Sequence, residues 1–499
     1  MSRAPVNTQE QHLVSMTAGG QKTKISGDTI EHDIEAGIPD AHTRQYPSAP
    51  THPSFGLHGR DPRLSFSQRS LRITWGWFSV CMSTGVMAML LSEQPYTFRG
   101  LVAIGTAFYL LNLVLFCTFF ALVVARFVRK PRAFITSLHH PSESFFFGSV
   151  WVSIALIIYG MQVYGVPRTG PWLVHVLAIL FWTYLTSATL VAIFQYHVIF
   201  HDERLTLTDA MPSWILPAYP LLMTGVLSAA IARSQTQHVG IHLIVAGIAG
   251  QGLGWILAFF IYTVYLTRLI HGSMPPASVR PGMYVSVGPA AYTCAGFLAL
   301  GKMAKKHLPP DFLGVQESFA VGDVWFAISV PTALFLWLIA IWFSALSTLS
   351  IIRAARKMKF SLQWWAFVFP NAGLAIATIQ VGNALESKGI KVAGSILTVL
   401  LVPLWILCAC LHVRSIWTHQ LLAPGKDVGV DDVNDTHDAK LERYRARKRD
   451  RVERQQAQGA RKQIGRGALW ARKWMSSPAP VEHGIAASEN SMETTQGHV

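Results

Sequence analysis

The side chains that could do chemistry in this sequence are neutral hydrogen-bonding groups placed beside helix breakers inside apolar segments. One such segment carries Pro370 and Asn371, followed by Thr378 and Gln380. Proline removes a backbone donor and clashes with the preceding turn. In lipid such a break is tolerated only where protein or a water-lined cavity satisfies the freed carbonyls. Backbone amides at the break and the positive ends of half-helices favour negative groups, so this chemistry suits transient contact with an anion.

Similar groups recur in other apolar segments. Together they give the candidates for lining a pathway or contacting its anion: Ser83, Thr84, Gln162, Thr224, Ser228, Arg280, Ser286, Pro289, Pro370, Asn371, Thr378 and Gln380. Hydroxyl and amide groups can hold an anion without trapping it, which permits release. For any single serine or threonine, packing between helices is the default explanation. For Arg280, anchoring at the membrane surface explains the charge at least as well.

Asp, Glu, Lys and Arg are absent from the middle of every apolar segment; Glu93, Arg233 and Lys302 lie near segment ends. A proton-driven carrier with a buried carboxylate relay would be expected to have at least one such residue in mid-membrane. His197 and His201 are spaced like metal ligands, but they lie where a segment leaves the membrane, so loop polarity explains them better. Without a nucleophile and base or a metal set, we expect no enzyme activity, no metal and no cofactor.

Ten apolar segments, each long enough to cross a bilayer, must position these residues. The chain is 51% hydrophobic and 14% charged, which is typical of a helical membrane protein and predicts an all-α integral membrane fold. The predicted spans are 73–92, 101–126, 145–165, 172–199, 214–233, 240–270, 283–303, 320–350, 363–385 and 391–418. Odd spans are shorter and hold most of the breakers, whereas even spans are longer and mostly aliphatic. This contrast predicts five hairpins with odd helices inside and even helices facing lipid.

Basic residues set the predicted topology. The loops after even spans, together with the Lys- and Arg-rich stretch 440–473, outweigh the opposite side, which predicts that both termini are cytoplasmic. We expect a disordered tail over 1–70, a transmembrane domain over 71–422 and a basic, mostly disordered tail over 423–499. A solvated tail is the simplest interpretation of the latter, attachment to anionic lipid headgroups is the functional one, and we expect no nucleic-acid partner.

Four motifs resemble one known family when taken in order. They are WGWFSVCMSTG at 75–85, SWILP at 213–217, RPGM at 280–283 with VGP at 287–289, and WWAFVFPN at 364–371. They resemble the tellurite-resistance/dicarboxylate transporter family, and within it the fungal malic-acid permease branch, which is related to plant slow-type anion channels. The resemblance implies ten helices in a quasi-fivefold arrangement, odd helices lining a central pore, a possible homotrimer, and a pore-blocking phenylalanine that maps to Phe369.

The resemblance implies a plasma-membrane transporter of C4-dicarboxylates such as malate, with succinate and related acids as further substrates. The alternative within transport is a channel or exporter for sulfite or another small inorganic anion. The alternative of another class is a membrane receptor or scaffold that acts through its basic tail. We expect Phe369 to be the gate rather than Phe367, because positions i and i+2 do not share a helix face. Trp364 and Trp365 are expected to anchor the segment at the membrane interface.

Overall fold

The computed structural model describes residues 72–139, 143–202, 210–271, 274–314, 320–418 and 420–422. Within these ranges the regular elements are all helices. The tails expected over 1–70 and 423–499 lie outside the described residues, so their disorder and the attachment of the C-terminal tail to lipid stay predictions. The described part of the chain confirms the all-α fold.

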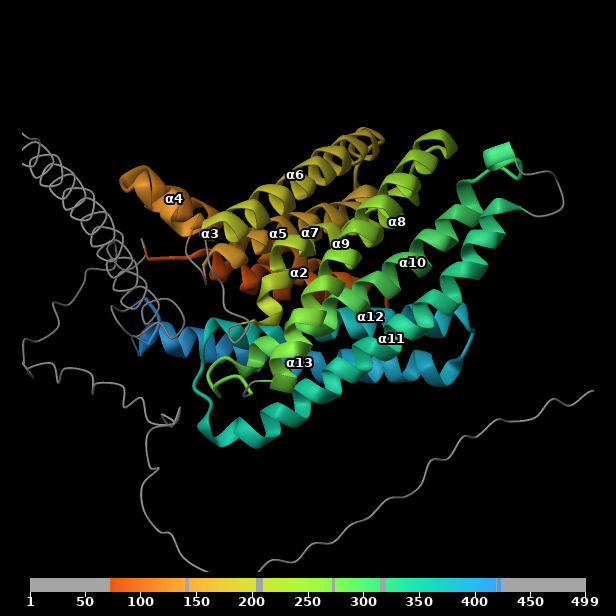
Figure 1. The fold of residues 1–499 in the computed structure, drawn as a ribbon. Coiled ribbons are helices and arrows are strands. Elements are labelled where there is room, and N and C mark those ends of the chain that lie inside the picture. The colour runs from red at the N-terminus through yellow and green to blue at the C-terminus, as the bar shows by residue number, and fades with distance from the viewer. Residues whose placement is uncertain are drawn as a thin grey trace, which may run out of the picture. The chain divides into compact units, whose positions relative to one another are not determined.

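Ten candidate membrane spans occur among the described residues, and they follow the predicted segments. The long helices of the even spans are α3 (Leu101–Arg129), α6 (Trp172–Asp202), α9 (Gln237–His271), α11 (Val321–Ala354) and α13 (Lys388–Trp417). The odd spans are built around α2 (Phe78–Ser92), α5 (Phe147–Gly160), α7 (Tyr219–Leu222) with α8 (Thr224–Ala232), α10 (Val287–His307) and α12 (Phe369–Ala384). The short α4 (Arg132–Leu138) follows α3. Consecutive spans pack as hairpins, such as α2 with α3 and α12 with α13 (Figure 1).

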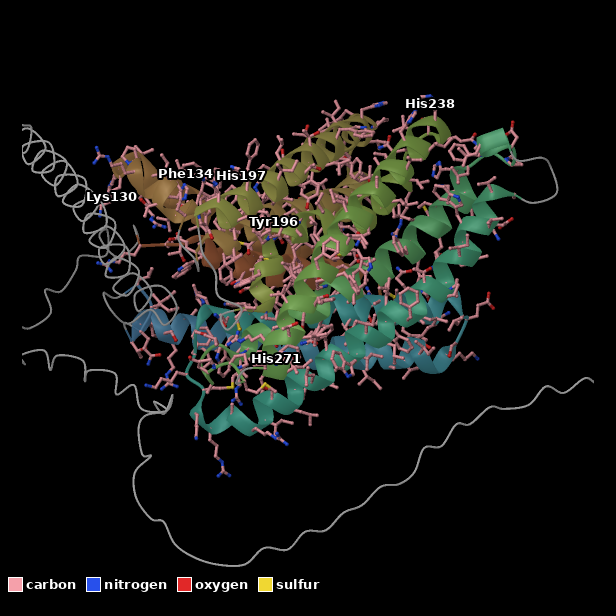
Figure 2. The ribbon with its side chains drawn as sticks, viewed as in Figure 1. Lys130, Phe134, Tyr196, His197, His238 and His271 are labelled. Atoms are coloured by element: carbon pink, nitrogen blue, oxygen red, sulfur yellow. The ribbon has the colours of Figure 1, made fainter. Side chains whose placement is uncertain are left out.

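Burial separates the two sets of spans. In the apolar 18-residue stretch of each odd span, 67% to 100% of residues are buried, against 17% to 33% in the even spans. Large apolar side chains such as Phe120, Phe194 and Phe260 are exposed on even helices, where the bilayer would cover them. The prediction that odd helices are inside and even helices face lipid is therefore confirmed. His197 of α6 and His238 and His271 of α9, which Figure 2 labels, are exposed on these even helices.

Every odd span begins with a 3₁₀ segment before its α-helix. These segments are η1 (Trp75–Trp77), η2 (Ser144–Phe146), η6 (Pro212–Ala218), η7 (Arg280–Ser286) and η10 (Leu362–Phe367). We call this end of the bundle the 3₁₀ end; the sequence predicts that it faces the cytoplasm. Runs of 3₁₀ helix longer than three or four residues are uncommon and often mark a functional hinge, and three of these segments reach six or seven residues.

The expected break at Pro370 is real, but its position differs from the prediction. The sequence predicts that Pro370 breaks a helix within its span, whereas Pro370 lies in the first turn of α12, just after the 3₁₀ segment η10. Proline fits there because a first-turn residue has no intrahelical acceptor for its N–H, and its fixed φ suits helix initiation. Pro370 therefore starts the helix instead of bending it.

Tyrosine hydroxyls satisfy carbonyls at these breaks. Tyr292 donates to the carbonyl oxygen of Phe369 at 2.9 Å, and Tyr184 donates to that of Pro220 at 2.7 Å. Tyr219 donates to the carbonyl oxygen of Val285. Val285 lies four residues before Pro289, so its carbonyl is the one that this proline frees, and the expectation that neighbouring protein satisfies a freed carbonyl is confirmed there.

The position of Trp365 differs from the prediction that it anchors its span at the membrane interface. Its side chain is only 1% exposed and donates from Nε1 to His412 Nδ1 at 3.3 Å. It therefore packs inside the bundle and does not anchor the span at the membrane interface. Trp364 is partly exposed and donates to the carbonyl oxygen of Lys359 at 3.0 Å. The two neighbouring tryptophans differ because adjacent residues in a helical segment point in different directions.

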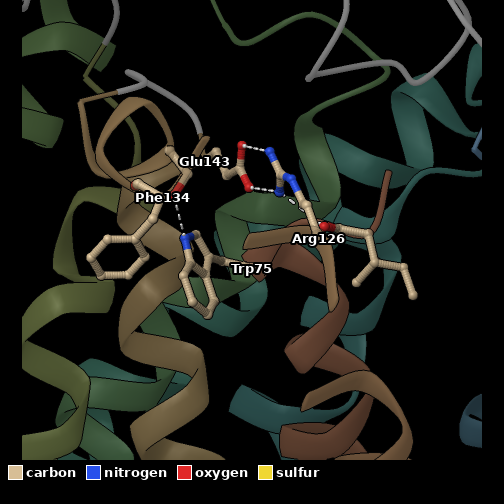
Figure 3. Close-up of polar contacts among 6 residues, drawn as sticks. Trp75, Arg126, Phe134 and Glu143 are labelled. Atoms are coloured by element: carbon tan, nitrogen blue, oxygen red, sulfur yellow. Dashed lines mark hydrogen bonds and ion pairs between the residues drawn. The ribbon is translucent and has the colours of Figure 1, made fainter. Parts of the chain in front are cut away.

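An ion pair braces the 3₁₀ end away from the centre of the bundle. Arg126, in the last turn of α3, contacts Glu143 at 2.7 Å and donates to the carbonyl oxygen of Ile73 at 2.9 Å (Figure 3). Beside it, Trp75 Nε1 donates to Ser137 of α4 at 3.0 Å. These contacts join the start of the first span to the end of the second and to the chain before the third.

Candidate transport pathway

Two small cavities lie between the odd spans. The first, at the 3₁₀ end, has a volume of about 40 Å³, and the second, towards the other end, has a volume of about 10 Å³. The first cavity is lined by residues of all five odd spans, which include Ser83, Ser149, Leu216, Val285 and Pro370. Met211, directly before span 5 of the ten, also lines it. Residues of all five odd spans also line the second, including Met89, Tyr159, Val226, Ala295 and Gln380. We call the first cavity the 3₁₀ cavity and the second the mouth cavity.

An aromatic block, made of Phe369, Tyr219 and Tyr292, closes the inner side of the 3₁₀ cavity. The Phe369 ring is 3% exposed and stacks on Tyr292 with 5.0 Å between ring centroids; Tyr219 lies 5.8 Å away. Phe369 lines the 3₁₀ cavity, and Ile376 of the same helix lines the mouth cavity. Seven residues of α-helix span about 10 Å. The aromatic block therefore stands at the boundary between the two cavities.

Phe367 has different neighbours from Phe369. Its ring lies 5.4 Å from that of Tyr284 and 5.5 Å from that of Trp364. It is not among the residues that line the 3₁₀ cavity. The two phenylalanines therefore point in different directions, as their spacing predicts.

The structure brings three of the twelve candidates to the cavities. Ser83 and Pro370 line the 3₁₀ cavity, where Ser83 Oγ also donates to the carbonyl oxygen of Trp365 at 3.0 Å. Gln380 lines the mouth cavity. Ser286 and Pro289 belong to the start of the seventh span, where Ser286 donates to the carbonyl oxygen of Met283 at 2.7 Å and Pro289 lies in the first turn of α10. Neither of these two lines a cavity.

Several candidates instead contact the surrounding even helices. Thr84 accepts a hydrogen bond from Trp405, Thr378 from Trp337, and Asn371 from Ser344. Thr224 bonds to the carbonyl oxygen of Gly247 at 3.4 Å, and Ser228 lies against the same glycine. These five side chains hold odd helices to even ones, which is the packing role that is the default for polar groups in membrane helices.

The two remaining candidates lie near the ends of the bundle. Arg280 donates to the carbonyl oxygens of Pro275 at 2.9 Å and Ser350 at 3.1 Å, so its charge fastens the 3₁₀ end. Gln162 lies in the π-helical turn Met161–Gly165 and accepts a hydrogen bond from Ser234 at 3.1 Å. Neither residue lines one of the two cavities.

Sequence reasoning missed a charged cluster at the mouth cavity. The mouth cluster consists of one residue from or directly after each odd span: Glu93, Tyr159, Arg233, Lys302 and Gln380. Glu93 accepts from Arg233 at 3.0 Å and from Tyr159 at 2.6 Å. Gln380 donates to Glu93 at 2.5 Å and accepts from Lys302 at 3.0 Å.

The signal for this cluster was present in the sequence. Glu93, Arg233 and Lys302 lie near span ends in the sequence, but the position of a residue along one helix does not tell which helix ends meet. Because the odd spans run in one direction and lie together, their last turns converge. The interior is therefore free of charge only up to the mouth cavity, which Glu93 and Arg233 line.

The histidine spacing leads to no metal site in the part of the chain that the structure describes. His197 and His201 stack with 5.7 Å between ring centroids. Within those ranges no three His, Cys, Asp or Glu side chains are grouped so that they could hold a metal ion.

Comparison with known proteins agrees with this architecture. The profile of the voltage-dependent anion channel family, SLAC1, matches residues 72–413, from the start of the first span to near the end of the tenth. The malic acid transport protein of Schizosaccharomyces pombe is 32% identical over 369 residues, which are 73% of this chain and 83% of that protein.

More distant relatives have other names. The sulfite efflux pump SSU1 of Trichophyton rubrum is 28% identical over 69% of this chain and 91% of its own. An uncharacterized transporter of Methanocaldococcus jannaschii is 23% identical over 69% of this chain and 95% of its own.

Members of the matched family are transporters or channels and not enzymes. Its match to 72–413, the ten apolar helices and the burial of the odd spans agree in assigning a multi-pass membrane protein that moves anions. The chain belongs to the voltage-dependent anion channel family.

Proposed function

We propose that this protein is a plasma-membrane transporter of C4-dicarboxylates such as malate, with succinate and related acids as further substrates. The proposed path runs between the odd spans, from the 3₁₀ cavity past the aromatic block to the mouth cavity. One observation carries the proposal: all five odd spans line two cavities, and Phe369 lines the first while Ile376, on the same helix, lines the second. The malic acid transport proteins among the relatives support the choice of substrate.

In this proposal Phe369 is a removable block. Its ring packs between the cavities without a covalent or ionic tie, and stacking on Tyr292 is worth about 1 kcal/mol. Neither cavity, at about 40 and 10 Å³, is large enough for a dicarboxylate, since sites for small molecules commonly measure about 300 Å³ or more. Conduction therefore requires the ring to move.

Uptake of radiolabelled malate tests the substrate. The full chain would be expressed in cells that lack endogenous dicarboxylate permeases, with surface amount measured in parallel. We expect saturable uptake that unlabelled succinate reduces. Absence of malate uptake at normal surface amount would contradict the proposal.

The alternative of a sulfite or small-anion exporter is favoured by one observation, the 28% identity to the sulfite efflux pump of Trichophyton rubrum. Competition in vesicles separates the two. Sulfite flux with no malate flux in the same vesicles would select the alternative. The receptor or scaffold hypothesis is not supported by the family match, since that family consists of transporters and channels.

We further propose that malate crosses as the monoanion. Carboxyl groups have reference pKa values near about 4, so a mildly acidic exterior leaves part of the acid singly protonated. A singly charged substrate suits the middle of the path, where the aromatic block offers no cation. Uptake is measured against pH at a fixed monoanion concentration, and a steep dependence on pH itself would refute the idea.

The topology and assembly complete the proposal. Both termini face the cytoplasm, in keeping with the basic loops after even spans, so the 3₁₀ cavity opens inward. A homotrimer is expected from the family resemblance. Epitope accessibility at each terminus in intact cells, and the mass of the detergent-solubilised protein, test these two points separately.

A further inference from the structure

The mouth cluster has the composition of a carboxylate-binding site whose ligand is a side chain of the protein itself. The Glu93 carboxylate receives three donors from three different spans: the Arg233 guanidinium, the Tyr159 hydroxyl and the Gln380 amide. Arginine and amide donors in this arrangement are those that proteins use to hold a carboxylate. The donor set would serve a carboxylate of an organic acid equally well.

The cluster also carries more positive than negative charge. Arg233 and Lys302 face a single carboxylate, Glu93, and Lys306 adds a further ammonium group that donates to the carbonyl oxygen of Arg233 at 3.1 Å. Among the residues that the structure describes, Lys302 is held through Gln380 and has no acidic partner of its own. An approaching anion is therefore attracted to this end even while Glu93 is in place.

Exposure distinguishes the members of the cluster. The Glu93 side chain is 9% exposed, whereas the Arg233 side chain is 45% exposed. The cavity beside them has a volume of about 10 Å³, close to the space for one water molecule. The guanidinium can thus meet an anion from outside, but no carboxylate can enter until the Glu93 carboxylate gives up its donors.

We propose that the mouth cluster is a carboxylate-recognition site and that Glu93 is its internal competitor. A substrate carboxylate takes the place of the Glu93 carboxylate on Arg233, Gln380 and Tyr159, while Lys302 supplies the second positive charge. Arg233 and Lys302 are then specificity-determining residues for organic acids over spherical anions, because chloride cannot use two fixed donors as a planar carboxylate does. This inference rests on the proposed dicarboxylate transport.

The test measures malate uptake and chloride conductance in the full-length protein carrying Arg233→Gln, Lys302→Gln or Glu93→Gln. Each cation variant removes one charged hydrogen bond, so we expect the KM for malate to rise roughly tenfold or more while chloride conductance changes less. Glu93→Gln keeps the size of the side chain and removes the competing charge, so the KM for malate is expected to fall.

Lys305→Gln is the matched control. Lys305 pairs with Asp323 at 2.8 Å at the same end of the bundle, but both side chains are more than half exposed and neither touches the cluster. We expect its KM for malate to stay at the wild-type value. If Arg233→Gln fails to reach the membrane, Lys302→Gln and the charge-retaining Lys302→Arg carry the test, since only the former should weaken malate binding strongly.

Unchanged KM and unchanged malate-to-chloride selectivity in Arg233→Gln and Lys302→Gln, at normal surface amount, would overturn the inference. A wild-type protein that conducts sulfite or chloride but not malate would refute the proposed function alone. In that case block of the conductance by external malate is measured: loss of the block in Lys302→Gln supports the recognition site, and absence of block in the wild type rejects it.

Discussion

At the 3₁₀ end of the odd spans, breaks in the helices are satisfied by neutral groups, whereas at the mouth the regular helices end in charges that meet. The first end uses tyrosine hydroxyls on backbone carbonyls, as with Tyr292 and Phe369. The second uses an ion pair and amides, as with Glu93 and Arg233. Backbone groups at a break are fixed in place, while side chains at helix ends can exchange partners. In the proposed path, the aromatic block is a steric barrier and the mouth cluster is an electrostatic one.

The 3₁₀ end has an ion pair as well, and its position shows the difference. Arg126 and Glu143 lie between an even helix and the chain before the third span (Figure 3), and neither lines the 3₁₀ cavity. Glu93 and Arg233 line the mouth cavity. The same chemistry therefore braces the fold at one end and faces the proposed path at the other.

The largest effect is expected where the backbone of two odd spans touches. A Cβ added at Gly148 would lie 2.0 Å from the carbonyl oxygen of Leu216, which no side-chain movement relieves. We expect Gly148→Ala to abolish folded protein, measured as monodisperse protein after detergent extraction. Gly252→Ala is the control, because nothing lies within 4 Å of that added Cβ. Equal yields for both variants would show that the 3₁₀ end tolerates separation of the spans.

Phe369→Ala tests the steric barrier. Removing the ring opens the boundary between the two cavities, and we expect anion flux to rise by about tenfold, which corresponds to about 1.4 kcal/mol off the barrier. Flux is measured as substrate-dependent current at equal surface amount. Phe367→Ala is the control, since its ring contacts Tyr284 and Trp364 and does not line the cavity. A larger increase of flux in Phe367→Ala than in Phe369→Ala would show that Phe367, and not Phe369, blocks the path.

Glu143→Gln sharpens the contrast between the two ion pairs. The Glu143 side chain is 5% exposed, so losing its charge should cost about 2 kcal/mol of stability. The thermal midpoint in detergent should fall while the KM for malate stays unchanged. If the KM for malate rose in Glu143→Gln as much as it is expected to rise in Arg233→Gln, the two ion pairs would not have different roles.

Tyr292→Phe should have a smaller effect. It keeps the ring that stacks on Phe369 and removes only the hydroxyl that donates to its carbonyl oxygen. We expect a loss of about 1 kcal/mol in stability and a modest rise in flux, because the start of α12 loses one hydrogen bond to a neighbouring span. Thermal melting and current recordings on the same preparation measure both. No change in either would mean that the hydroxyl does not hold the block.

Truncation after Asp427 should have the smallest effect. The family match ends at residue 413, and the described spans end with α13. Malate uptake per molecule at the surface should equal that of the full chain. Loss of malate uptake at an unchanged surface amount would show that transport requires the basic tail.

Much of this fold could be predicted because burial in membrane proteins is periodic and extensive. The ten spans and the inside position of the odd ones followed from apolar length and from where breakers gather. The position of Pro370 at a helix start did not follow, since a proline allows both a kink and a first turn. The contacts of Thr84 and Thr378 with even helices could not be predicted from the sequence, because the direction of a hydroxyl depends on the rotation of its helix. The mouth cluster could not be predicted, because the sequence does not show which span ends converge.

The 3₁₀ segment before Phe369 has one further consequence. A 3₁₀ helix rises about 2.0 Å and turns about 120° per residue, against about 1.5 Å and 100° for an α-helix. If the six residues Leu362–Phe367 rewound into α-helix, the segment would shorten by about 3 Å and α12 would rotate by about 120° relative to the start of the span. Such rewinding would turn Phe369 by about a third of a revolution relative to the start of the span, and away from its stacking on Tyr292.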